Sequence, residues 1–392
     1  MSVKSFGIIF AGALSLVAVN TVTAIAVNPV PATSVLKSSD TKHYSNNLVN
    51  KNVGKARSHR ETNRKISNRA ISSTAATSSP SGSLNVRGWE WSQISQTPTA
   101  QTAQNLSTFV NFGGTSVTVD ATKLVDVSEI ADPLKRQAAD SAIRANLTEY
   151  FALAQTAGIT EASVLVGTPT WTHTETHYIP NIVAKWVADF NSNAQPGALL
   201  IKNVEWDVEP WGTPEWINGD RAAKRSLSVL WLTLMREVVS KQGSATTSVA
   251  APYWFDSNDR RAAPLVRFEG VLDSPISHLF RILNSRNGNT IALMAYRDYA
   301  TGPGGSIAAV SQEFELSKQY NVGVWIGQDI AAPINGEPLV STFYDNSVQD
   351  LKNSMNAIVE QYGKNQNFSG FAINHIGAPL LEQYSSSNAV NW

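Results

Sequence analysis

The sequence of 392 residues contains no cysteine and no apolar run long enough to cross a membrane. Without cysteine the chain can form neither disulfides nor thiolate metal sites, and it offers no thiol for lipid attachment. The longest apolar run, residues 6–19, is shorter than the roughly 20 residues that a membrane helix needs. We therefore expect no membrane span, and a fold whose stability comes from its hydrophobic core.

The short apolar run near the start of the chain has the features of an export signal. Lys4 precedes it, and the small residues Thr23, Ala24 and Ala26 follow it at a spacing that suits a signal peptidase. The alternative, an uncleaved membrane anchor, would need a longer run. The sequence therefore predicts a cleaved signal peptide over residues 1–26 and a secreted or cell-surface location.

The formal net charge of zero conceals two segments of opposite charge. Residues 27–84 hold nine Lys or Arg against Asp40 and Glu61, whereas 21 basic and 29 acidic residues follow position 84. The basic segment is rich in Ser, Asn and Thr and lacks periodicity, which predicts a disordered linker or pro-segment. An alternative is weak docking of residues 51–69 on an anionic polymer or surface. The acidic charge of the remaining chain argues against nucleic acid as a partner.

From residue 85 onward, short runs rich in β-branched and aromatic residues alternate with amphipathic stretches. The predicted strands span residues 85–91, 116–120, 162–167, 202–208, 247–254, 290–296, 322–327 and 370–374. Predicted helices between them include residues 133–157, 182–191, 220–241, 306–320 and 347–362. Eight strand and helix units in this order predict an α/β protein, a single (β/α)₈ TIM barrel over residues 85–392.

Two structural alternatives concern this barrel. A doubly wound open sheet would also alternate strands with helices, but no glycine-rich dinucleotide fingerprint follows the first predicted strand. The connection over residues 254–289 is long for a single loop, so we expect an inserted lid over the mouth of the barrel.

Side chains that act on substrates in such barrels lie at the C-terminal ends of the strands. Here those ends are polar and aromatic, and Asp120 and Asp329 stand at two of them. Tryptophan offers a flat apolar surface with one polar N–H, which suits the faces of sugar rings. The residues predicted to contact a carbohydrate substrate are Trp89, Glu90, Trp171, Glu205, Trp211, Trp254, Arg297, Asp298, Gln328, Asn374 and His375.

The fourth predicted strand carries an acidic stripe. Glu205, Asp207 and Glu209 occupy every second position along it and therefore share one face. Successive members lie about 6.5–7 Å apart along the strand. Three such carboxylates would repel one another if all were ionised, and we expect at least one to hold a proton near neutral pH. Glu209, nearest the mouth, is the predicted general acid. The alternative for the other two carboxylates is pairing with Lys202, Arg87 or Arg297 inside the barrel.

Two short motifs in this order resemble those of family 18 glycoside hydrolases, the chitinases and endo-β-N-acetylglucosaminidases. These are Asp207-Val208-Glu209 on the fourth strand and Met294-Ala295-Tyr296 on the sixth. The resemblance implies that Glu209 is the acid, that Asp207 stabilises a substrate acetamido group acting as internal nucleophile, and that Tyr296 hydrogen-bonds that group.

The chain departs from that family at three places. Glu205 stands where the family usually has Asp, Lys202 stands where a further Asp is common, and the eighth strand lacks the usual tryptophan at its end. Residues 206–210, 294–298 and 371–375 also resemble a group of poorly characterised bacterial exported barrels related to glycoside hydrolases, in which Gln328 stands where Glu is frequent. That second resemblance implies polysaccharide processing at the cell surface.

The sequence thus predicts a secreted glycoside hydrolase acting on a polysaccharide that contains 2-acetamido sugars. One alternative is a barrel that binds glycans as a lectin does, without catalysis. Another is a hydrolase of a different exopolysaccharide with a carboxylate nucleophile, for which Glu90 and Asp298 are candidates. His173, Glu175 and His177 lack the order of a zinc helix, so no metal and no other cofactor is predicted.

Overall fold

The computed structural model describes residues 84–382, apart from residues 93, 257–262 and 334–337. The predicted signal peptide and most of the predicted basic linker lie outside the described residues. The barrel strands are β1 (Val86–Glu90), β2 (Ser116–Asp120), β3 (Glu161–Val166), β4 (Ile201–Trp206), β5 (Thr246–Pro252), β8 (Thr290–Met294), β9 (Gly323–Asp329) and β10 (Phe368–Asn374).

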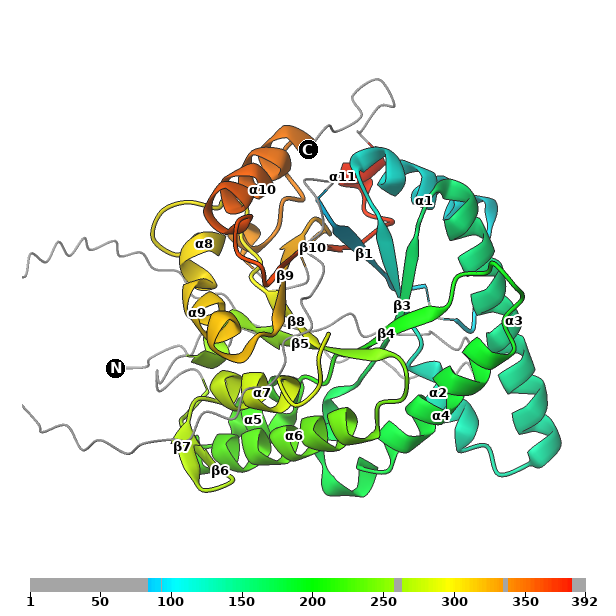
Figure 1. Cartoon of the computed structure of the whole chain (residues 1–392), viewed down its shortest axis with the longest axis horizontal. Coiled ribbons are helices and arrows are strands. Elements are labelled where there is room, and N and C mark those ends of the chain that lie inside the picture. Colours follow the sequence, from blue (N-terminus) through cyan, green and yellow to red (C-terminus); the bar gives the residue numbers. More distant parts are fainter. Residues whose placement is uncertain (1–83, 93, 257–262, 334–337, 383–392) are drawn as a thin grey trace, which may run out of the picture. The chain divides into compact units, whose positions relative to one another are not determined.

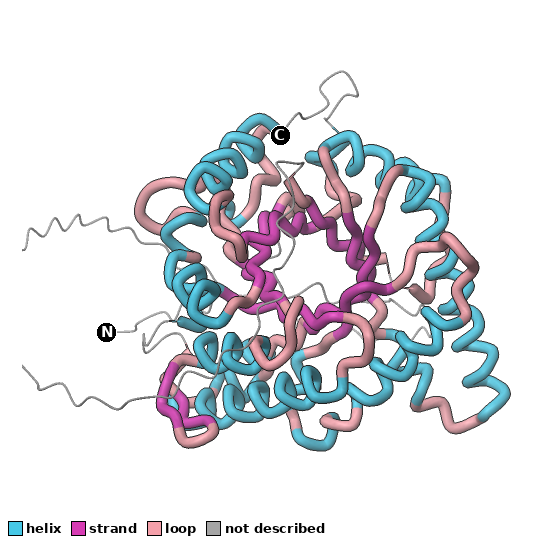
Figure 2. Tube along the Cα trace, viewed as in Figure 1, coloured by secondary structure: helices cyan, strands magenta, loops and turns pink. Residues whose placement is uncertain are grey.

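These eight strands are parallel and close in the order β1-β10-β9-β8-β5-β4-β3-β2. Figure 1 and Figure 2 show the closed ring of strands with the helices arranged around it. The predicted (β/α)₈ barrel is therefore confirmed, and the open-sheet alternative is wrong.

Three strands end two residues earlier than the sequence predicted, and this moves the candidate site onto loops. β4 ends at Trp206, because Glu209 (φ −105°, ψ 82°) leads into the 3₁₀ helix Pro210–Gly212. β8 ends at Met294, where the amide of Ala295 donates to the carbonyl of Leu293 instead of continuing the ladder. β5 likewise ends at residue 252 and not 254. The residues after these ends can turn across the mouth.

The helices follow local sequence signals. In α3 (Pro133–Ala157), Asp132 accepts the amides of Leu134 and Lys135, and Gly158 ends the helix in the left-handed region (φ 112°). The predicted helix over residues 306–320 is divided into α8 (Ser306–Ala309) and α9 (Ser311–Tyr320). The other helices are α1 (Ala100–Phe112), α2 (Lys123–Ser128), α4 (Ile179–Ser192), α5 (Pro214–Asn218), α6 (Arg221–Lys241), α7 (Pro275–Leu283), α10 (Val348–Tyr362) and α11 (Pro379–Glu382).

The long connection between β5 and β8 does not form the expected lid in its described part. It contains the hairpin of β6 (Val266–Phe268) and β7 (Val271–Asp273), followed by α7. β6 contacts α6, and α7 packs against α6 and α9, so α7 is a member of the outer helix ring (Figure 1). Nearly the whole of α7 is buried, which explains why its sequence is strongly apolar.

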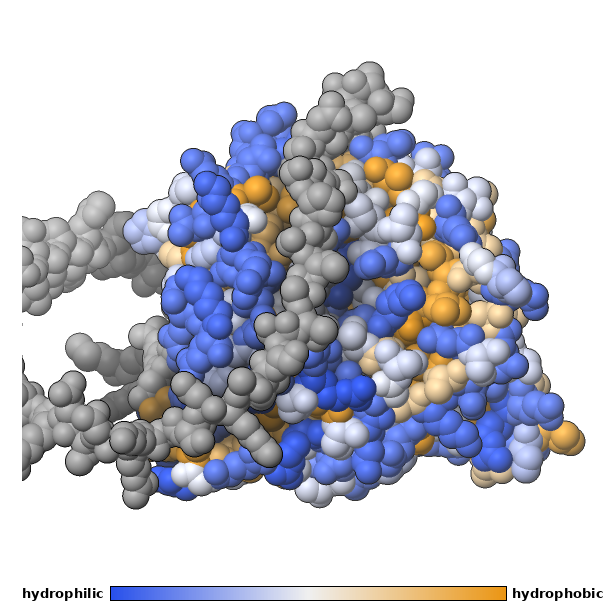
Figure 3. Space-filling view, in the orientation of Figure 1, coloured by the Kyte–Doolittle hydropathy of each residue, from blue (hydrophilic) through white to orange (hydrophobic). Residues whose placement is uncertain are grey.

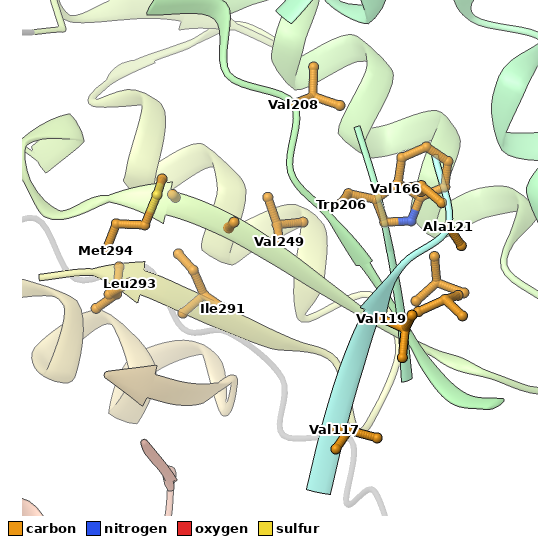
Figure 4. Packing of buried hydrophobic residues seen from close by; sticks show 14 of the residues in the cluster. Val117, Val119, Ala121, Val166, Trp206, Val208, Val249, Ile291, Leu293 and Met294 are labelled. Atoms are coloured by element: carbon orange, nitrogen blue, oxygen red, sulfur yellow. The ribbon is translucent and has the colours of Figure 1, made fainter. Parts of the chain in front are cut away.

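Alternating side chains of the strands divide the core into two parts. Val166, Trp206 and Val208 are among the buried residues that pack outside the strands, toward the helices (Figure 4). A smaller group, which includes Trp89 and Leu165, fills the interior of the barrel. The surface in Figure 3 is mostly hydrophilic with scattered apolar patches. Among the described residues, no helix combines the length and the apolar character needed to cross a membrane.

Closure of the barrel between β10 and β1 depends on a glycine. Gly370 has φ 124°, and a Cβ there would lie 2.1 Å from the carbonyl oxygen of Asn85. We expect Gly370→Ala to lower the free energy of unfolding by about 2 kcal/mol or more, from backbone strain and the clash. The measurement is urea unfolding, with Gly243→Ala as control, because nothing lies within 4 Å of a Cβ at Gly243. Equal small losses in both variants would contradict this expectation.

Candidate active site at the mouth of the barrel

The interior of the barrel contains a buried ion pair between β1 and β4. Arg87 Nη2 lies 2.6 Å from Glu205 Oε2, and the two side chains are 3% and 0% exposed. Trp89 donates its indole N–H to Glu205 Oε1 at 2.5 Å, and the Arg87 guanidinium lies 4.4 Å from the centroid of the Trp325 ring. Among the partners considered from the sequence, Glu205 pairs with Arg87. It lies beneath the mouth with both oxygens engaged, not in a position to contact a substrate as predicted.

Asp207 follows directly on β4, deep among other carboxyl groups. Its amide donates to the Val166 carbonyl at 3.0 Å, and a Cβ on Gly167 would lie 2.1 Å from the Asp207 carbonyl oxygen. Burial, and then the charges of Glu205 and Asp120, raise the pKa of Asp207 to about 7. The carboxyl group of Asp207 is therefore partly protonated near neutral pH.

Tyr296 lies among the carboxyl groups. Burial raises the pKa of its phenol well above the usual value, and nearby charges raise it further, in decreasing order those of Asp329, Asp207, Glu209 and Glu205. The phenol therefore stays protonated and can donate a hydrogen bond. We call Asp207, Glu209, Tyr296 and Asp329 the mouth cluster. It contains the three residues that the sequence predicted to carry the chemistry.

Asn374 on β10 and Gly327 on β9 shape one side of the mouth cluster. Asn374 Nδ2 donates to Asp329 Oδ1 at 3.1 Å, while Asn374 Oδ1 accepts the indole N–H of Trp91 at 2.6 Å. A Cβ on Gly327 would lie 3.0 Å from the Tyr296 ring, so the absence of a side chain there leaves room for the phenol. The predicted residue Asn374 thus orients Asp329 and holds Trp91 at the rim.

Gln328 does not enter the mouth cluster, and Asp329 does. On β9, Trp325 faces the barrel interior and Ile326 packs outside the strands. Gln328 has the parity of Ile326, is fully buried, and donates to the carbonyl of Gly327 at 2.8 Å. The sequence placed both residues at a strand end, and strict alternation along β9 was the signal that could have selected Asp329.

Glu90 and His375 lie together, away from the mouth cluster. Trp89 faces the barrel interior, so Glu90, the next residue, faces a cavity beside α1 and α3. Burial lowers the pKa of His375, and the charge of Glu90 opposes that shift only in part. The structure therefore brings these two predicted residues to one another and not to the predicted acid.

The predicted tryptophans differ in their environments. Trp171 is 7% exposed and packs against Trp206, with ring centroids 6.4 Å apart, among the residues outside the strands. Trp211 is 5% exposed and packs edge to face on Trp254 at 5.7 Å. Trp254 and Trp91 are only partly buried. Of the predicted tryptophans, Trp254 is thus partly exposed, whereas Trp171 and Trp211 are buried and stabilise the loops.

Arg297 and Asp298 follow β8 at the rim and are held by backbone contacts. Arg297 donates to the Tyr296 carbonyl at 2.6 Å and to the Tyr253 hydroxyl, and its guanidinium lies 4.8 Å from the centroid of the Tyr253 ring. The amide of Asp298 donates to the Val340 carbonyl at 3.0 Å. Arg297 thus joins the loops after β5 and β8 beside Tyr296.

His173, Glu175 and His177 lie around the 3₁₀ helix Thr174–Thr176, after β3. Within the described ranges, no group of three or more His, Asp or Glu side chains is placed to hold a metal ion.

The raised pKa of Asp207 makes stability depend on pH. The folded-state pKa of about 7 exceeds the unfolded value of about 3.9. The contribution of Asp207 to the free energy of unfolding is therefore greatest below about pH 4 and falls as pH rises toward 7. We expect Asp207→Asn to be more stable than the wild type above pH 7, by at most about 4 kcal/mol, and to lose that advantage near pH 4. Thermal unfolding across this range measures it, with the exposed Asp189→Asn as control. An advantage independent of pH would contradict the assignment.

No protein-family model and no curated protein matches the chain. Among solved structures, the chain is similar to the catalytic domain of a β-amylase from Paenibacillus polymyxa (10% identity, 78% of this chain and 98% of that one, TM-score 0.45). It is also similar to the spore cortex-lytic enzyme SleL of Bacillus cereus (13%, 76% and 72%, TM-score 0.41). A third is a GH18 chitinase from Pseudoalteromonas aurantia (11%, 77% and 98%, TM-score 0.40).

The solved structures that resemble this chain thus include GH18 chitinases and other glycoside hydrolase barrels. All three TM-scores above are below 0.5, so the function of this chain has to be inferred from its own side chains.

Proposed function

We propose that this chain is a secreted glycoside hydrolase that cleaves a polysaccharide containing 2-acetamido sugars. The observation that carries the proposal is the mouth cluster, in which the charges of Asp207, Glu209 and Asp329 raise the pKa of Tyr296. Such a concentration of carboxyl groups at the C-terminal ends of barrel strands is costly for stability and typical of acid and base chemistry. Hydrolysis of a glycosidic bond requires an acid for the leaving oxygen and a group that stabilises positive charge at the anomeric carbon.

Glu209 is the proposed acid. It is 4% exposed, follows β4 by three residues, and stands where the loop turns into a 3₁₀ helix at the mouth. From there a carboxylic acid can protonate the oxygen that leaves with the departing sugar, and the resulting carboxylate can take a proton from the attacking water.

Asp207 and Tyr296 are the proposed partners of the acetamido group. When the acetamido oxygen attacks the anomeric carbon, positive charge develops on the amide, and ionised Asp207 stabilises it by accepting the N–H. Tyr296 stays protonated and donates its phenol hydrogen to the same group. Because the pKa of Asp207 is about 7, a positive charge that develops beside it lowers this pKa and favours the ionised carboxylate.

Asp329 supports a second candidate mechanism. It lies in the mouth cluster, is 6% exposed, and is oriented by Asn374. A carboxylate there is a better candidate for a covalent nucleophile than Glu90, which faces another cavity. A hydrolase that uses Asp329 in this way would not need an acetamido group on its substrate.

The first test is the release of reducing ends from chitin, peptidoglycan and acetamido-rich exopolysaccharides by the secreted protein. We expect Glu209→Gln to lower the rate by about 100-fold or more, because general acid catalysis contributes factors of that size. Glu215→Gln, an exposed residue of α5, is the matched control and should retain activity. Tight binding of one polymer without cleavage by the wild type would instead support a lectin-like barrel.

The second test separates the two mechanisms. With acetamido assistance, Asp207→Asn should lower kcat by about 100-fold or more while Asp329→Asn costs less, and a substrate without the acetamido group should not be cleaved. Cleavage of that substrate, with complete loss of activity in Asp329→Asn, would favour the carboxylate nucleophile. Steady-state kinetics on a matched pair of chromogenic glycosides makes the comparison.

Secretion and the basic segment belong to the proposal as well. The signal peptide predicted over residues 1–26 would deliver the barrel to polysaccharides outside the cell, and the basic segment could hold it weakly on an anionic surface.

A further inference from the structure

A polar cavity lies beside the barrel, next to the end of β1. It has a volume of about 200 Å³ and lies between the loop after β1, the first turns of α1 and the middle of α3. Its polar lining includes Glu90, Gln101, Asn105, Asn146 and Tyr150. None of these residues is required by the proposed hydrolysis.

The side chains of Glu90 and Tyr150 give this cavity the character of a built site. Glu90 is 7% exposed, and one of its carboxylate oxygens accepts the amide of Ser92 at 2.9 Å. Tyr150 is 3% exposed, and its hydroxyl has no hydrogen-bond partner among the described residues. A buried hydroxyl without a partner costs about 1–3 kcal/mol, so its retention calls for an explanation.

The electrostatics define which groups the cavity can recognise. Burial, and then the charge of Glu90, raise the pKa of Tyr150 well above its usual value, so its phenol remains a donor. Glu90 supplies an acceptor of hydrogen bonds. Asn146 is already engaged by Thr97 and by the Ile94 carbonyl, and Gln101 donates to Asn105. Glu90 is the charged group of the lining, and no Lys or Arg stands beside it among the lining residues. Its negative charge would therefore repel an anionic ligand.

The volume of the cavity and the apolar part of its lining further restrict the class of ligand. The volume is below the roughly 300–1,000 Å³ of clefts that hold drug-sized ligands, which favours a single small unit. Ile94, Val119 and Leu147 add apolar groups to the lining. A compact ring with hydroxyl groups at its edge and C–H groups on its face fits this combination.

We propose that this cavity binds one neutral sugar unit through Glu90 and Tyr150, independently of the mouth cluster. Glu90 accepts hydrogen bonds from sugar hydroxyls, and the Tyr150 phenol donates to a sugar oxygen. The alternation along β1 separates the two sites, because Trp89 faces the barrel interior and Glu90 faces the cavity.

The experiment is a ligand-observed NMR titration of the full chain carrying Glu209→Gln, with glucose, galactose and N-acetylglucosamine in turn as probes. A free monosaccharide has no glycosidic bond to cleave, so binding is measured whether or not the proposed hydrolysis is correct. We expect at least one of the three sugars to bind, and Tyr150→Phe to raise its Kd about 3- to 10-fold, as the loss of one neutral hydrogen bond does. Glu90→Gln should weaken binding too, and Glu149→Gln, the exposed neighbour on α3, should leave the Kd unchanged.

Thermal unfolding of the same variants separates ligand recognition from a structural role. Tyr150→Phe removes a hydroxyl that has no partner, so its Tm should equal or exceed that of the parent while its Kd rises. Failure of all three sugars to bind would overturn the proposal. Binding that is insensitive to both Tyr150→Phe and Glu90→Gln would also overturn it, since the sugar would then occupy another site.

Discussion

The ion pair of Arg87 and Glu205 inside the barrel is the constraint on which the candidate site depends. Burial lowers the pKa of Arg87 and Glu205 opposes that shift, so each charge is tolerable there mainly because of the other. With Glu205 held by Arg87 and Trp89, its negative charge is fixed directly below Asp207. That charge is one reason why the pKa of Asp207 rises to about 7. The properties of the mouth cluster are therefore set from below, by residues that no ligand needs to touch.

Much of this fold could be predicted from the sequence because its signals are local. Eight β-branched runs separated by amphipathic stretches leave few arrangements other than a closed parallel barrel, and α3 has both of its ends marked by Asp132 and Gly158. The ends of β4, β5 and β8 were placed too late, since apolar and aromatic residues continue into the turns that follow. The helix α7 was taken for part of a lid because its apolar character does not reveal which neighbours cover it.

The sequence placed residues correctly where their chemistry and the alternation along the strand agreed. It misplaced residues where the direction of the side chain decided which face of the strand they occupy. Asp207 and Glu209 lie near enough to Tyr296 for their charges to raise the pKa of its phenol. Gln328 and Glu90 stand one residue away from side chains that enter the barrel, and a shift of one residue reverses the face of a strand. Trp171 was chosen for its ring, but rings also fill cores, and only packing distinguishes the two uses.

The contact between Gly167 and the backbone of Asp207 has a consequence for how the site is prepared. The main chain of Asp207 is held in two ways. Its amide donates a hydrogen bond to the Val166 carbonyl of β3, and the backbone of Gly167, which has no side chain, packs against it. The barrel therefore sets the position of the Asp207 backbone, and only the side-chain torsions remain to orient its carboxyl group.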